Sequence, residues 1–194
     1  MFNSGGFQHS DGLSSSVTVA GVDATPVRMD MSPAAQETAH DPVWVIYASE
    51  TGVAEHLARD TCRTLQDAGV VSRLLPFDAL DLDTLQTVND ALFLVSTCYD
   101  GDPPDMAEEF CREHMRNPVQ LLRLRYGLLA LGDSYYDEFC GFGRRLQQWL
   151  QVSGAQALFE LVEMDDEDEV AARCWHDRVG AVVRWRRHAG DAAL

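Results

Sequence analysis

The sequence predicts an α/β domain with a doubly wound, five-stranded parallel sheet and helices on both faces. From residue 42 onward, short apolar runs of strand length alternate with segments in which apolar residues recur at helical spacing. Such alternation is typical of βαβ units with right-handed crossovers. Loops rich in Gly, Ser, Thr and acidic residues follow the first, third and fourth strands. This favours the strand order 2-1-3-4-5 and places a binding site between the first and third strands.

The expected strands are apolar runs bounded by turn residues. The first, at residues 43–48 (VWVIYA), is continuously apolar, as expected for a parallel strand buried on both faces. The other four are expected at residues 70–75, 91–97, 126–131 and 158–162.

The expected helices connect these strands. The first, at residues 55–68, has apolar positions at helical spacing and a stop signal at Gly69. Three more are expected at residues 106–115, 139–153 and 169–188. In the segment 139–153, one side would carry Phe139, Phe142, Leu146, Trp149 and Leu150.

Composition indicates where the folded domain begins and which kinds of partner it can bind. Residues 1–40 are rich in Ser, Gly and Ala without a sustained period, so we expect a disordered or loosely attached N-terminal extension and a folded domain at residues 41–190. The 194 residues are 46% hydrophobic, which suffices for one core. A formal net charge of -16 argues against nucleic acid and predicts neutral or basic partners.

Cysteine usage and hydropathy indicate a cytoplasmic protein. The 5 cysteines are scattered and form no C-x-x-C pair, which suits reduced thiols better than a disulfide framework or a zinc site. No apolar stretch approaches the roughly 20 residues of a membrane span, and the N-terminus lacks the pattern of a signal peptide. We therefore expect no membrane insertion.

Three segments carry the candidate site. They read YASETGVAE at residues 47–55, STCYDGDPPDMAEEF at residues 96–110 and LALGDSYYDEFCGFGR at residues 129–144. In this order and approximate spacing they resemble the FMN loops of flavodoxin-like domains, especially those of diflavin reductases such as the sulfite reductase flavoprotein. The resemblance covers about residues 43–178. It implies a flavodoxin-like fold and an FMN-binding electron carrier, here as a stand-alone domain.

The first loop is expected to hold the phosphate. Hydroxyl donors, a glycine that lets the backbone approach, and the N–H groups of a helix start would converge without a lysine. A Ser/Thr-capped helix start is the plainer alternative. Neither the Walker nor the G-x-G-x-x-G pattern is present. The expected contacts are Ser49, Glu50, Thr51, Gly52, Val53 and Ala54, with the Glu50 carboxylate pointing away from the phosphate.

The second loop departs from the family pattern S-T-Y-G-E-G-x-P-P-x. Cys98 stands where the family often has an aromatic that covers one flavin face, and Tyr99 stands where it has glycine. A non-glycine residue at positive φ costs roughly 1 kcal/mol. Either Tyr99 supplies the ring by a one-residue shift, or the loop is rearranged and the one-electron-reduced flavin is stabilised less. The expected contacts are Ser96, Thr97, Cys98, Tyr99, Asp100 and Gly101.

The third loop is expected to supply an aromatic stack. Tyr136, rather than Tyr135, matches the tyrosine that lies against the flavin in the family. Cys140 suits an inert packing role better than that of a redox thiol. Asp165 occupies the approximate position of an acidic residue near the flavin. The expected contacts are Leu131, Gly132, Asp133, Tyr136, Phe139, Cys140 and Asp165.

These features predict an electron carrier rather than a free-standing enzyme. The resemblance implies a separate FAD/NADPH reductase as donor and a redox acceptor, both docking through basic faces. Acids around the expected flavin edge would lower its potential and steer such partners. One competing interpretation is an interaction module that has weakened or lost FMN binding. Another, a reductase using NAD(P)H directly, is disfavoured because no nicotinamide domain follows. No metal site, H-E-x-x-H motif or G-x-S-x-G motif occurs.

Overall fold

The computed structural model describes residues 41–165 and 168–191. The N-terminal extension expected at residues 1–40 lies outside the described residues, so the domain bounds 41–190 stay a prediction.

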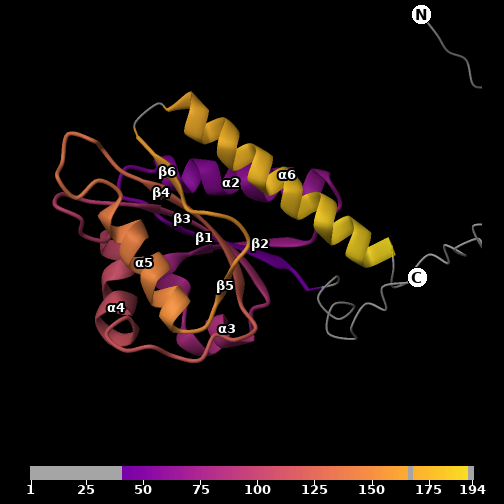
Figure 1. Ribbon diagram of the computed structural model, residues 1–194, viewed down its shortest axis with the longest axis horizontal. Helices are drawn as coiled ribbons and strands as arrows, with labels where there is room; N and C mark the ends of the chain where they lie inside the picture. The colour runs from indigo at the N-terminus through magenta and orange to yellow at the C-terminus, as the bar shows by residue number, and fades with distance from the viewer. Residues whose placement is uncertain (1–40, 166–167, 192–194) are drawn as a thin grey trace, which may run out of the picture. The chain divides into compact units, whose positions relative to one another are not determined.

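A parallel sheet organises the described chain (Figure 1). Its first four strands are β1 (Val43–Ala48), β2 (Ser72–Pro76), β3 (Asp90–Ser96) and β4 (Arg125–Leu131). The order β2-β1-β3-β4-β5 confirms the predicted 2-1-3-4-5 topology. Because β1 and β3 pair in parallel with Ala48 opposite Val95, the loops that follow them leave the same edge of the sheet.

The last strand differs from the prediction. It is divided into β5 (Gln156–Ala157) and β6 (Val162–Met164), both parallel to β4, and the expected strand at 158–162 falls mainly on the interruption between them. The interruption accommodates a side chain: a Cβ added at Gly127 would lie only 2.2 Å from Cζ of Phe159. The Phe159 ring therefore occupies the space that the absent side chain of Gly127 leaves, and it packs edge to face with Trp175.

Two helical layers cover the sheet, as predicted (Figure 1). On one face lie α2 (Val53–Asp67) and α6 (Glu169–Asp191). The other face is covered by the 3-10 turn η1 (Phe77–Ala79), α3 (Leu82–Thr87), α4 (Asp105–His114) and α5 (Gly141–Val152). The apolar core between the sheet and this second layer contains edge-to-face aromatic contacts of Phe77 with Phe110 and Phe142.

Two helical features differ from the sequence expectation. The helix α3 was not predicted, because six residues are too few to show a helical period. Its local signal is Asp81, whose carboxylate accepts a hydrogen bond from the Thr84 N–H at 2.6 Å as an N-cap. The helix expected at 139–153 begins only at Gly141, so Phe139 belongs to the preceding loop. No helix in the described ranges is long and apolar enough to cross a membrane.

A buried ion cluster lies at the amino edge of the sheet, opposite the loops. Asp90, at the start of β3, is 1% exposed. One carboxylate oxygen lies 3.1 Å from Nη1 of Arg186 in α6, and the other lies 2.8 Å from Nε of Arg125 in β4. Arg186 also donates to the backbone carbonyl of Asp41, and burial lowers its pKa. The cluster ties α6 to two neighbouring strands.

Candidate functional site

A cavity of about 400 Å³ opens at the carboxyl edge of the sheet, where β1, β3, β4 and β6 end. This is the switch point of the strand order, where α/β sheets of this kind bind ligands. Its lining residues are Glu50, Thr51, Val53, Ser96, Thr97, Cys98, Tyr99, Leu131, Gly132, Asp133, Tyr136, Met164 and Asp165. All but Met164 were expected from the sequence. Met164 was missed because the last strand was expected to end at residue 162, whereas β6 continues to Met164.

The first loop forms a helix start without a side-chain cap. Gly52 is the N-cap residue of α2 at φ 93, and no side chain caps the first helical turn. The N–H of Gly52 donates to Oγ of Ser49 at 2.9 Å, so this hydroxyl shapes the turn from within. Thr51 is exposed on the cavity wall. The loop therefore offers a hydroxyl and the positive end of a helix to an anion.

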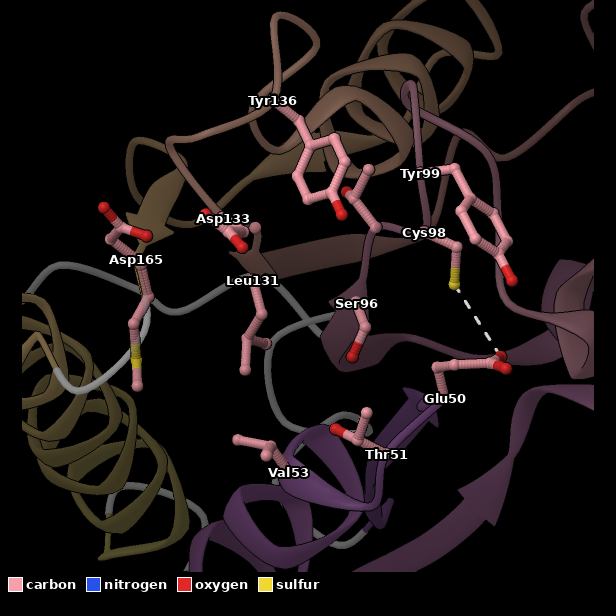
Figure 2. A pocket seen from close by; sticks show the side chains of 13 residues that line it. Glu50, Thr51, Val53, Ser96, Cys98, Tyr99, Leu131, Asp133, Tyr136 and Asp165 are labelled. Atoms are coloured by element: carbon pink, nitrogen blue, oxygen red, sulfur yellow. Dashed lines mark hydrogen bonds between the residues drawn. The ribbon is translucent and has the colours of Figure 1, made fainter.

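Glu50 faces the second loop (Figure 2). The Cys98 thiol donates to its carboxylate with Sγ and Oε2 3.7 Å apart. Burial, and then the negative charge of Glu50, raise the pKa of Cys98 to about 11. The cysteine is therefore a neutral thiol at physiological pH, and the Glu50 carboxylate is engaged on that side of the cavity.

The second loop closes as a tight turn. Cys98 and Asp102 exchange backbone hydrogen bonds, 2.8 Å in each direction. Between them Tyr99 has φ 44 and Gly101 has φ 98. Tyr99 is 76% exposed at the rim, beyond Cys98 as seen in Figure 2. The tyrosine therefore adopts the positive φ expected of the family's glycine, and the thiol of Cys98 takes the inner position.

The third loop places one tyrosine of its pair at the cavity. Asp133 Oδ1 accepts from the Tyr135 N–H at 2.9 Å, and Asp165 Oδ1 accepts from the Ser134 N–H at 3.1 Å. These bonds shape the loop so that Tyr136 lines the cavity, 48% exposed, while Tyr135 is 96% exposed. Figure 2 shows Tyr136 directed toward the cavity, across from Thr51 and Val53.

Several expected site residues lie behind the wall or away from it. Cys140 is fully buried, its thiol donates to the Ala130 carbonyl at 3.2 Å, and burial raises its pKa to about 12. Thr97 lines the cavity, yet its Oγ1 accepts from the Phe142 N–H at 3.3 Å. The expected residues that do not line the cavity are Ser49, Gly52, Ala54, Asp100, Gly101, Phe139 and Cys140. Within residues 41–165 and 168–191, no His, Cys, Asp and Glu cluster is arranged to hold a metal ion.

Comparison with known proteins agrees with this geometry. Residues 45–175 match the flavodoxin family. The chain belongs to the flavodoxin family. It is 34% identical over 145 residues to the sulfite reductase [NADPH] flavoprotein alpha-component of Vibrio cholerae, covering 72% of this chain and 23% of the relative. The Bacillus subtilis protein of the same name is 35% identical over 150 residues, covering 73% of this chain and 25% of the relative.

A further relative and a solved structure are also similar to this chain. Rabbit (Oryctolagus cuniculus) NADPH–cytochrome P450 reductase is 34% identical over 131 residues, covering 63% of this chain and 19% of the relative. A point mutant of Pseudomonas aeruginosa flavodoxin superposes with a TM-score of 0.62 at 23% identity, covering 76% of this chain and 99% of that one. That likeness shows the fold. The chain thus spans about a quarter of the length of the curated sulfite reductase relatives it matches.

Proposed function

We propose that this domain binds FMN in the carboxyl-edge cavity and carries electrons between a separate reductase and a redox acceptor. The observation that supports this most directly is the pairing, across one cavity, of an uncapped helix start with an aromatic and apolar wall. The first suits a phosphate, and the second suits a flat ring system. When bound, the flavin supplies the redox chemistry.

Each wall of the cavity has a distinct part in this proposal. The first turn of α2 and the Thr51 hydroxyl hold the phosphate. Tyr136 covers one ring face, and Leu131 and Met164 exclude water from the ring edge. On the other side Cys98, with its pKa raised to about 11, contributes a neutral thiol close to the Glu50 carboxylate. A carboxylate held there opposes negative charge on the reduced ring and so lowers its potential.

The rim supports docking of a basic-faced redox partner. Five acidic residues that follow β3 and β4 are exposed: Asp100 and Asp102 in the second loop, Asp105 at the start of α4, and Asp137 and Glu138 in the third loop. Their field would attract a basic surface and bring it to the exposed flavin edge. We therefore expect electron transfer from an FAD-containing NADPH reductase to slow as ionic strength rises over the range where the Debye length falls from about 30 to about 8 Å.

A flavin titration tests the binding step. FMN, riboflavin and FAD are added separately to the flavin-free protein while flavin fluorescence is followed. We expect FMN to bind most tightly, because riboflavin lacks the phosphate and the adenylate of FAD extends beyond the cavity. Equal affinity for FMN and riboflavin would contradict the assignment of α2 as the phosphate site.

Anaerobic reduction tests the carrier role. NADPH alone should leave the flavin spectrum unchanged, whereas NADPH with a catalytic amount of an FAD-containing reductase should bleach it. Bleaching by NADPH alone would instead identify a reductase that uses the nicotinamide directly.

A second candidate is an interaction module with weakened flavin binding. The observation that favours it is the second loop, where a thiol replaces a covering aromatic and Tyr99 lies 76% exposed at the rim. The same titration separates the two: this candidate predicts no saturable FMN binding while the protein still binds the reductase.

A further inference from the structure

A second cavity lies beside the first, on the face covered by α4 and α5. Its volume is about 370 Å³, close to that of the flavin cavity. Met115, Pro118 and Val152 supply apolar wall, and the nearly buried Trp149 forms part of its floor. Pro103, four residues beyond Tyr99 of the flavin cavity, also lines it. The cavity therefore has room for a small ring and adjoins the second flavin loop.

The charge of this cavity is opposite to that of the protein as a whole. The formal net charge of the chain is -16, and the flavin cavity is lined by Glu50, Asp133 and Asp165. The second cavity is lined by two arginines, Arg116 and Arg145, and no carboxylate is among its lining residues in the described part of the chain. A local positive site in a negative protein favours an anion.

The two guanidiniums are available to a ligand. Among the described residues neither forms an ion pair, whereas Arg112, one turn before Arg116, lies 3.5 Å from both Glu109 and Glu113. Arg145 donates to the backbone carbonyl of Gly101, which engages only part of its donor set. Guanidinium groups match the geometry of a carboxylate through paired N–H donors.

We propose that this second cavity binds a small aromatic carboxylate, with its carboxylate on Arg116 and Arg145 and its ring against Met115, Pro118 and Val152. The volume of about 370 Å³ suits a one- or two-ring acid. This binding step does not depend on the flavin function proposed above.

The position of Arg145 couples the ligand to the flavin loop. Arg145 holds the carbonyl of Gly101, inside the turn in which Tyr99 and Gly101 take positive φ. A carboxylate that draws Arg145 toward itself weakens that contact and changes the turn beside the flavin. By linkage, the acid and FMN then alter each other's affinity by the same factor. This coupling, unlike the binding step, rests on the proposed flavin function.

The binding test uses the full chain without flavin and 2-naphthoate as the probe, followed by calorimetry and by the indole N–H resonance of Trp149. We expect saturable binding that weakens about tenfold in Arg116→Gln and in Arg145→Gln, the scale of one lost charge-assisted hydrogen bond. Arg112→Gln is the matched control and should bind as the parent does. The neutral naphthalene-2-carboxamide should bind about tenfold more weakly than the acid.

Three results would overturn the proposed site: absence of saturable binding, equal affinity for acid and amide, or unchanged affinity in both cavity variants. Thermal unfolding of each variant identifies any that fails to fold. The coupling is tested by measuring FMN affinity with and without saturating 2-naphthoate. A ratio of one refutes the coupling. A chain that binds no FMN refutes the proposed function, while the probe titration still decides whether the second cavity is a site.

Discussion

At the carboxyl edge of the sheet, the acidic side chains of the loops are exposed to solvent. At the amino edge, by contrast, Asp90 and Arg186 form a buried ion pair. The exposed acids need no partner, because water solvates them, and their field remains available to ligands and proteins. The buried pair has no hydration by bulk water, so each charge depends on the opposite charge for its stabilisation. Exposed charge at the carboxyl edge would serve recognition in the proposed function, whereas buried charge at the amino edge joins α6 to the sheet.

The edges also differ in backbone conformation. Among the described residues, the non-glycine positions at positive φ are Tyr99 and Cys140, and both belong to loops at the carboxyl edge. Local strain of this kind persists at sites where the surrounding structure imposes it. Changes at the amino edge should therefore alter stability without affecting flavin binding, whereas changes at the carboxyl edge should act mainly on flavin binding.

The largest effect is expected at the amino edge. Asp90→Ala leaves Arg186 as a buried charge without its carboxylate and should lower the free energy of unfolding by about 3–5 kcal/mol, measured by urea denaturation. FMN affinity of the folded fraction should not change. The double variant Asp90→Leu with Arg186→Met removes both charges and should recover most of the loss. A double variant as unstable as the single one would show that the ion pair is not the cause.

At the phosphate end of the cavity, Gly52→Asp should reduce FMN affinity by about 3 kcal/mol, the interaction of two like charges some 5 Å apart near a protein surface. A Cβ at Gly52 meets no atom within 4 Å, so the variant adds charge without a clash in the protein itself. Its φ of 93 adds a backbone strain of about 1 kcal/mol. Thr51→Ala should weaken FMN binding less. Equal losses for FMN and riboflavin would show that the phosphate does not lie there.

At the ring, Tyr136→Ala should weaken FMN binding by about 1–3 kcal/mol through lost stacking area. Tyr135→Ala is the matched control, since that side chain is 96% exposed and should change the affinity little. Fluorescence titration of FMN into the three proteins measures both. A larger loss from Tyr135 would mean that the third loop binds in another register.

In the second loop, Cys98→Tyr with Tyr99→Gly should restore a covering ring and a glycine at positive φ. Tyr99→Gly alone should relieve up to about 1 kcal/mol of backbone strain. The double variant should accumulate more one-electron-reduced flavin in an anaerobic titration. Unchanged accumulation despite intact FMN binding would refute the idea that Tyr99 hinders the turn.

The smallest effect concerns the Cys98 thiol. Because its pKa is raised to about 11, alkylation by iodoacetamide should accelerate about tenfold per pH unit from pH 7 toward 11. Glu50→Gln removes a charge that opposes the thiolate, so its profile should shift to lower pH. Since the folded pKa lies above the unfolded value near 8.5, this thiol favours folding below that pH and loses the contribution as pH rises toward 11. An unshifted profile would contradict the contact with Glu50.

The sequence alone predicted the central strands, their order and most of the cavity wall. Strands β1, β3 and β4 are buried on both faces, so continuous apolar runs such as VWVIYA mark them within a residue or two. The loops that follow them necessarily meet at one edge of a parallel sheet. That is why 12 of the 13 residues lining the cavity were expected.

Tertiary structure decided the rest. The division of the last strand depends on Phe159 lying over Gly127, a contact between residues far apart in the chain. The same holds for Cys98, whose neighbour Glu50 belongs to another loop. It also holds for Asp90, which lies just before the strand expected at residues 91–97 and meets Arg186 only when α6 packs against the sheet. The local sequence pattern indicates which secondary structure a segment favours. Burial and charge pairing depend on which distant segments pack against it.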